Sequence, residues 1–264
     1  MKDWPPYKSP HGVTSRQRDF GSQIIRMAGL YSSAIIISAP DGTDFHSASG
    51  FLMKLADQTF LVTNAHVVQK YREVKSARGE ALLEFGGRSI TPHIVDEVYT
   101  DFVDIATLDV DGVDFERASK GYWSSGITLE AYAPSAWPID APKKGEPIVT
   151  VGWPAKLRVH EGGPDVEFAA FSMTGMAIDA VEDGWFAVPF EREHWTSTEN
   201  DVAHPAVSET EFGGTSGSPV FVLHRSKLEP LHLVGLNNAY GKELDLLYCT
   251  RTDLIATDGT IARR

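Results

Sequence analysis

Cysteine is almost absent from this sequence, since Cys249 is the single cysteine among 264 residues. An intrachain disulfide is therefore excluded, and disulfides are common in secreted domains but rare in reducing compartments. The first residues, "MKDWPPYKSPHG", also lack the apolar stretch of a secretory signal. Together these features predict a cytoplasmic location.

Basic residues are in deficit: 24 Lys and Arg stand against 36 Asp and Glu, for a net charge of −12. Nucleic acids and anionic membrane surfaces both require a cationic face, so we expect neither as a partner. Long hydrophobic runs are missing as well. The longest, such as "AIIISA", have the length of a strand rather than of a membrane span.

The remaining pattern is that of a β-rich globular protein. One helix is expected within residues 14–31, where Thr14 could cap it and Gly29 could end it. After it, short β-rich runs alternate with turn signals rich in Gly, Pro, Asp and Asn, which favours a sandwich or barrel. These runs are "SSAIIIS", "ASGFLMKL", "TFLVTNA", "EPIVTVGWP", "VEFAAFSMTGMAI", "GWFAVPF", "SPVFVLH", "LHLVGLNNA" and "LLYCT".

The polar segment 116–143, which contains Pro and Gly, divides the chain into two parts that are each large enough for a barrel. We expect an N-terminal extension over residues 1–30 and one domain over 31–264. Within that domain the first barrel covers about 31–115 and the second about 144–255, followed by a short tail.

Two motifs in the first half place titratable side chains at strand ends. His66 follows the apolar run "FLVTNA", and histidine can take and return a proton near neutral pH. Asp104 interrupts the apolar run "DFVDIATLDV", where burial would require a partner. It could cap a turn, or it could orient a histidine ring. Asp101 and Asp109 are rivals for the second role.

The motif "EFGGTSGSPVF" is far more specific. It sets Ser216 among small residues directly before an apolar strand. A nucleophilic serine needs two main-chain amides that converge on the developing oxyanion, and glycine permits the backbone conformation that turns an amide toward the substrate. A nucleophile elbow of the α/β-hydrolase type fits poorly, because Ser218 stands where its last glycine would be.

These segments resemble a known family. "TNAHVV", "DIATLDV" and "GGTSGSPVF" are similar to the three signature segments of the chymotrypsin-like (trypsin-fold) serine peptidases, in the order His, Asp, Ser. "VGWPA" and "LVGLNNA" are similar to further segments of the disulfide-poor bacterial branch that includes the Deg/HtrA proteases. Only "IATDGTIARR" follows the last strand, so the PDZ domain usual in that branch is not expected.

The resemblance implies an all-β fold of two six-stranded antiparallel barrels with a short helical extension at the N-terminus. It implies a serine endopeptidase in which His66 is the general base, Asp104 orients it and Ser216 attacks the peptide carbonyl. The oxyanion hole would consist of the amides of Gly214 and Ser216. No cofactor and no metal are expected, and the substrate is a protein or peptide.

The resemblance also locates a specificity pocket. Its base would be Thr210, which carries no charge, and a bulky Leu246 would make it shallow, so we expect a preference for small or medium apolar side chains. Glu209 and Glu211 could instead favour a basic residue. The pocket wall would be Leu236, Asn237, Asn238 and Ala239 together with Leu246.

Thr215 stands where secreted digestive relatives carry an aspartate that pairs with a newly cleaved N-terminus. We therefore expect no zymogen switch of that kind, and control by a regulatory protein partner stays open. Two alternatives to a peptidase also stay open. One is a catalytically silent trypsin-fold binding or scaffold protein, and the other is an esterase that uses the same triad.

Overall fold

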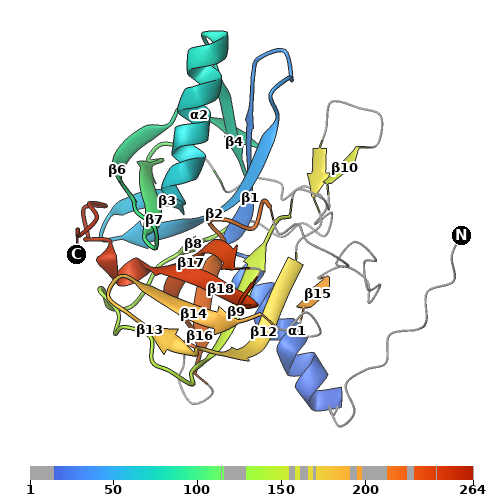
Figure 1. Cartoon of the computed structure of the whole chain (residues 1–264), viewed down its shortest axis with the longest axis vertical. Helices are drawn as coiled ribbons and strands as arrows, with labels where there is room; N and C mark the ends of the chain where they lie inside the picture. Colours follow the sequence, from blue (N-terminus) through green and yellow to red (C-terminus); the bar gives the residue numbers. More distant parts are fainter. Residues whose placement is uncertain are drawn as a thin grey trace, which may run out of the picture.

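The structure is a computed structural model, and it describes residues 15–113, 115, 129–154, 158–160, 166–168, 171–190, 195–197, 213–224, 229–241 and 243–263. Figure 1 shows two curled sheets, one above the other, with one helix lying against each.

The first sheet is formed by the first half of the chain. Its strands are β1 (Ser32–Ser38), β2 (His46–Leu55), β3 (Gln58–Thr63), β4 (Leu82–Phe85), β5 (Arg88–Ile90), β6 (His93–Tyr99), β7 (Asp104–Asp109) and β8 (Ala131–Tyr132). Their order is β5-β4-β1-β2-β3-β7-β6, and every pairing along this path is antiparallel. The short β8 pairs with β2 in parallel, although it comes from the predicted connector.

The second sheet is formed by the second half. Its strands are β9 (Pro147–Gly152), β12 (Phe171–Ala177), β13 (Ala180–Val181), β14 (Trp185–Pro189), β15 (Trp195–Ser197), β16 (Pro219–Leu223), β17 (Leu231–Gly241) and β18 (Leu246–Arg251). Their order is β13-β14-β18-β17-β16-β9-β12-β15, and all pairings are antiparallel. A separate hairpin joins β10 (Arg158–His160) to β11 (Val166–Phe168).

The predicted all-β fold of two antiparallel units is confirmed, but each sheet contains eight strands rather than six. The difference lies in strands of two or three residues, such as β8, β13 and β15. Segments this short have no period of their own and form only because a longer strand offers its edge, so the sequence pattern does not reveal them.

The helix expected near the N-terminus is present as α1 (Ser15–Gly29). Its buried residues Ile24 and Ala28 belong to the same hydrophobic cluster as Val149 and Val151 of β9. The last turns of α1 therefore cover part of the second sheet.

The second helix, α2 (Ala65–Arg78), begins directly after β3 and lies on the outside of the first sheet (Figure 1). A short 3₁₀ turn, η4 (Thr252–Leu254), follows β18. In the part of the chain that the structure describes, no helix is long and apolar enough to cross a membrane.

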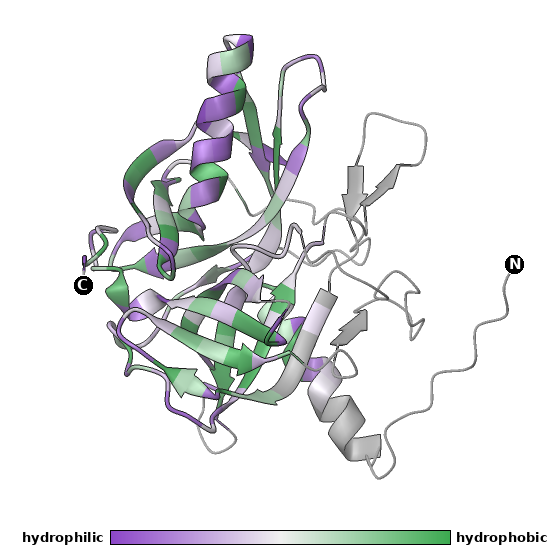
Figure 2. Ribbon diagram, viewed as in Figure 1, coloured by the Kyte–Doolittle hydropathy of each residue, from purple (hydrophilic) through white to green (hydrophobic). Residues whose placement is uncertain are grey.

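The core joins the two halves. One cluster combines Phe51 and Phe60 of the first sheet with Val149 and Phe221 of the second. Figure 2 shows hydrophobic residues along the strands and hydrophilic stretches on α2. Cys249 is fully buried, as expected of a small apolar residue, and burial raises the pKa of its thiol far above the usual range.

Candidate active site

His66 and Asp104 meet where β3 passes into α2. His66 lies in the first turn of α2, and Asp104 is the first residue of β7. The ring Nδ1 of His66 lies 2.5 Å from Asp104 Oδ2, and the main-chain amide of His66 donates to Oδ1 at 3.1 Å. The amides of a first helical turn have no partner within the helix, so the carboxylate caps α2 while it holds the ring.

The main chain of Asp104 is held by side chains from both halves of the chain. Its amide donates to Thr250 Oγ1 at 3.0 Å, and its carbonyl accepts from Asn64 Nδ2 at 2.6 Å. The residue is 2% exposed, and its hydrogen bonds offset the cost of burying its polar groups. The side chain of His66, in contrast, is 39% exposed and open to a substrate.

The two rival carboxylates are elsewhere. Asp101 is exposed in the loop before β7. Asp109 ends β7, and its Oδ2 lies 3.6 Å from Nδ1 of His93. Of the three aspartates considered from the sequence, the structure brings Asp104 to His66.

Ser216 lies in the loop directly before β16, between two glycines with left-handed backbones. Gly214 has φ +98° and Gly217 has φ +87°, a region that favours glycine. A Cβ on Gly217 would lie 2.1 Å from the carbonyl oxygen of Ser49 and 2.6 Å from Thr63 Oγ1. The glycine is therefore required for the loop to approach the first sheet this closely.

This approach brings Ser216 to the end of the first sheet that carries His66. The amide of Ser49 donates to the Ser216 carbonyl at 2.8 Å, and Thr63, which Gly217 contacts, is three residues before His66. The hydroxyl of Ser216 lies 3.5 Å from the Asn238 carbonyl oxygen. Between the described side chains of Ser216 and His66 there is no hydrogen bond.

The amides of Gly214 and Ser216 are the two predicted donors of the oxyanion hole. Within the described residues neither donates a hydrogen bond. The Thr215 carbonyl accepts both the amide and the hydroxyl of Ser218, at 3.0 and 2.5 Å. Because the C=O and N–H of one trans peptide point in opposite directions, this contact turns the Ser216 amide to the other side of the loop.

The residues predicted to shape a specificity pocket are less completely placed. Thr210, Glu209 and Glu211 lie outside the described residues. Leu236 and Asn237 are 0% and 2% exposed, whereas Asn238 and Leu246 are half-buried and Ala239 is exposed. Thus only the last three can offer their side chains to a substrate without a rearrangement, and the pocket assignment stays a prediction.

Sequence reasoning missed an aromatic cluster beside the site. Phe102, which is 47% exposed, stacks on Trp185 with ring centroids 5.0 Å apart, and Tyr248 contacts both rings. The Phe102 carbonyl accepts from Asn238 Nδ2, so the cluster adjoins the strand next to Ser216. Phe102 stands two residues before Asp104, but no local pattern in the sequence links it to Trp185 or Tyr248.

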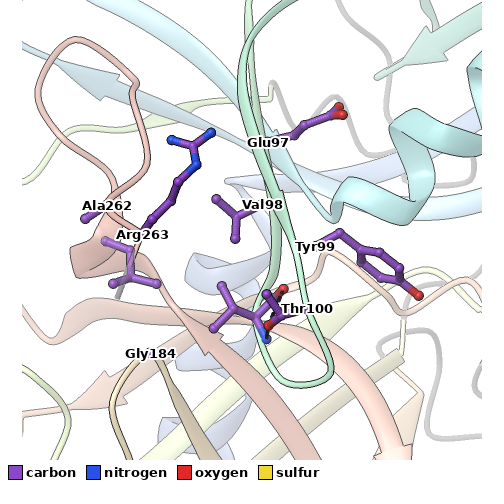
Figure 3. A pocket seen from close by; sticks show the side chains of 9 residues that line it. Glu97, Val98, Tyr99, Thr100, Gly184, Ala262 and Arg263 are labelled. Atoms are coloured by element: carbon purple, nitrogen blue, oxygen red, sulfur yellow. Dashed lines mark hydrogen bonds between the residues drawn. The ribbon is translucent and has the colours of Figure 1, made fainter.

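A cavity of about 400 Å³ lies apart from His66 and Ser216, between β6 and the last residues of the chain. Figure 3 shows Val98 pointing from β6 toward Arg263, with Glu97 and Tyr99 on the other side of the strand. Its lining residues are Glu97, Val98, Tyr99, Thr100, Val103, Gly184, Leu254, Ala262 and Arg263.

Residues 48–228, which include His66, Asp104 and Ser216, match the family model described as "Trypsin-like peptidase domain". The chain belongs to this family. The comparison with curated protein sequences found no match.

Several solved structures match this chain at low sequence identity. The Rv3671c protease of M. tuberculosis in its active form is 14% identical over 96% of this chain and 90% of its own, with a TM-score of 0.44. Serine protease AL20 from an extremophilic microorganism is 13% identical over 85% and 92%, with a TM-score of 0.44. Tobacco etch virus protease, in an inactive form with substrate, is 12% identical over 85% and 80%, with a TM-score of 0.43.

Membership of a trypsin-like peptidase family implies a peptide substrate. Among the described residues, no group of three or more His, Cys, Asp or Glu side chains is placed to hold a metal ion.

Proposed function

We propose that this trypsin-like peptidase domain is a serine endopeptidase that hydrolyses peptide bonds through an acyl-enzyme on Ser216. The observation that carries the proposal is the double contact of the Asp104 carboxylate with the ring and the main-chain amide of His66. A buried carboxylate with a half-exposed histidine suits acyl transfer when it lies near a serine loop. The amides of Gly214 and Ser216 in that loop donate no hydrogen bond to any described residue, which leaves them available to an oxyanion.

In the proposed reaction, the Asp104 carboxylate accepts a hydrogen bond from Nδ1–H of His66, which keeps the proton on Nδ1 and leaves Nε2 as the base. Ser216 Oγ attacks the substrate carbonyl as its proton passes to Nε2, and the amides of Gly214 and Ser216 stabilise the oxyanion. His66 then returns the proton to the leaving amine. Water repeats the sequence on the acyl-enzyme and frees Ser216.

One rearrangement precedes the attack. The Ser216 hydroxyl contacts the Asn238 carbonyl at 3.5 Å and forms no hydrogen bond with the His66 ring, so the two side chains must come into hydrogen-bond contact before the attack. Rotation between staggered positions is a small barrier for an accessible serine. The substrate preference that we propose remains a small or medium apolar side chain before the scissile bond.

The orientation of Ser216 also supports a second candidate, a trypsin-fold protein that is silent until a partner binds. The candidate docking segment is the N-terminal extension, residues 1–30. Since Ile24 and Ala28 are buried, a deletion that tests this role must leave both in place.

Labelling with a fluorophosphonate serine probe tests the proposal, in parallel with cleavage of a mixed peptide library. The intact chain should be labelled, and Ser216→Ala and His66→Ala should not. Ser135→Ala removes an exposed serine on the surface and should leave labelling unchanged. An unlabelled intact chain would exclude a competent site and favour the silent candidate. Labelling without peptide cleavage would favour an esterase.

A further inference from the structure

Ser49 of β2 forms four hydrogen bonds at the candidate site, three with the second half of the chain and one with Thr63 of β3. Its amide donates to the Ser216 carbonyl at 2.8 Å, and its hydroxyl donates to the Gly214 carbonyl at 2.6 Å. The same hydroxyl accepts from the Trp153 amide at 2.9 Å, and the Ser49 carbonyl accepts from Thr63 Oγ1 at 2.8 Å. The residue is 0% exposed, so water cannot replace these partners.

These contacts fix two alternate peptide groups of the serine loop. The Ser49 hydroxyl holds the group between Gly214 and Thr215, and the Ser49 amide holds the group between Ser216 and Gly217. Ser218 holds the group between them through the Thr215 carbonyl. A peptide group is planar, so fixing its carbonyl oxygen also fixes the direction of its N–H.

Gly214 needs such support because glycine has no side chain that restricts its backbone. Its φ of +98° is one of several conformations open to glycine, and a glycine freed from its contacts can leave it at little cost. The Ser49 hydroxyl is the side-chain group that binds the Gly214 carbonyl among the described residues. The Gly214 carbonyl and the Gly214 amide lie on opposite sides of one Cα, so the contact with Ser49 fixes one side of this residue and limits how far its amide can turn.

We infer that Ser49 is a positioning residue, whose hydroxyl holds the serine loop in the conformation that presents the amides of Gly214 and Ser216 to an oxyanion. The effect of Ser49 on catalysis rests on the proposed function. That the Ser49 hydroxyl, on the first sheet, holds the serine loop of the second half rests on the hydrogen bonds alone.

The test compares Ser49→Ala with Ser32→Ala. Ser32 is also 0% exposed, and its hydroxyl also forms two hydrogen bonds, with the Val151 carbonyl and the Trp153 ring, both at 3.1 Å. Neither partner lies in the serine loop. The two substitutions thus remove the same group at the same burial from neighbouring strands.

The first readout is amide hydrogen exchange of the loop, which requires no activity. Gly217 donates to the Asn237 carbonyl and Ser218 to the Thr215 carbonyl, so both amides are protected. In Ser49→Ala they should exchange at least about 10-fold faster than in the intact chain, because the peptide group between Gly214 and Thr215 is released and the serine loop loses its side-chain link to β2. In Ser32→Ala they should exchange as in the intact chain.

The second readout is peptide hydrolysis. Loss of one oxyanion contact typically lowers kcat by about 10²-fold or more, so Ser49→Ala should lower kcat by about 10- to 100-fold while KM changes less than about 3-fold. Should Ser49→Ala fail to fold, Ser49→Cys takes its place, because a thiol is of similar size and a weaker donor.

Unchanged exchange at Gly217 and Ser218 in Ser49→Ala would overturn the inference, whatever the activity. Faster exchange with unchanged kcat would also overturn it, because the loop would then be loose without consequence for the oxyanion. If the intact chain cleaves no peptide, the proposed function fails, but faster exchange in Ser49→Ala alone would still support the positioning contact.

Discussion

The Asp104 carboxylate caps helix α2 at the same residue whose ring it holds. One oxygen accepts the His66 amide at 3.1 Å, and the other lies 2.5 Å from the ring Nδ1. A single carboxylate thus fixes both the backbone and the ring of His66. Any movement of Asp104 must move the ring relative to Ser216, so the chemistry depends on how firmly Asp104 is held.

The substitution Asp104→Asn should leave the fold intact and remove most of the activity. The asparagine amide can still accept the His66 main-chain N–H, but its NH₂ group then donates to Nδ1 and forces the ring proton onto Nε2. That tautomer cannot accept a proton from Ser216, and we expect kcat for a peptide substrate to fall on the order of 10⁴-fold.

The control for this measurement is Asp101→Asn, which changes an exposed carboxylate three residues away. It should retain a kcat close to that of the intact chain. Equal loss in the two variants would mean that general charge near the loop, and not the contact with His66, supports the reaction.

Thr250→Val should destabilise the fold by about 1–3 kcal/mol, because the Asp104 amide then loses its acceptor in a buried position. Denaturant unfolding measures this change. Thr252→Val is the matched control: Thr252 is equally buried, but its hydroxyl donates to the Leu233 carbonyl over 3.4 Å and leaves no amide unpaired. A loss in Thr252→Val as large as that in Thr250→Val would contradict the argument.

The site residues that were predicted from the sequence lie in short local motifs, whereas the residues that were missed act through contacts between distant parts of the chain. His66, Asp104 and Ser216 each stand inside a local motif, and the chemistry of the residue type limits the choice. Ser49 and Thr250 act through contacts with partners 165 and 146 residues away. A single serine or threonine in a strand has no local pattern that identifies its partner, so these contacts emerge only from the packing of the two sheets.

The strands show the same limit. "SSAIIIS" coincides with β1 because an apolar run between turn signals defines a strand by itself. "VEFAAFSMTGMAI" contains two strands, β11 and β12, that pair with different partners. Pairing across a sheet decides such breaks, and the alternation of side chains along one segment does not reveal them.

The attachment of the C-terminal segment should weaken in acid. Asp96 accepts hydrogen bonds from the amides of Ile261 and Glu97, and Arg263 binds both of its carboxylate oxygens. Burial alone would raise the pKa of Asp96, but these donors together hold it below its usual value.

A carboxyl group whose pKa is lower in the folded protein stabilises it fully above the pKa of the unfolded chain, near 4. The stabilisation is lost as pH falls from there through the lowered pKa. The intact chain should therefore have a higher Tm than Asp96→Asn at pH 7, and the difference should shrink below about pH 4. A difference that is constant from pH 7 to pH 3 would contradict this assignment.

Two glycines of the serine loop should respond very differently to the same substitution. A Cβ at Gly217 would lie 2.1 Å from the Ser49 carbonyl oxygen, and its φ of +87° strains any other residue. Gly217→Ala must therefore push the loop away from β2, and strain of this kind costs at least about 2 kcal/mol.

A Cβ at Gly213 has no atom within 4 Å, and that backbone is not left-handed. Gly213→Ala should thus unfold at nearly the same denaturant concentration as the intact chain. Comparable losses in both variants would show that the loop is not packed against Ser49, and the positioning of Ser216 by the first sheet would have to be abandoned.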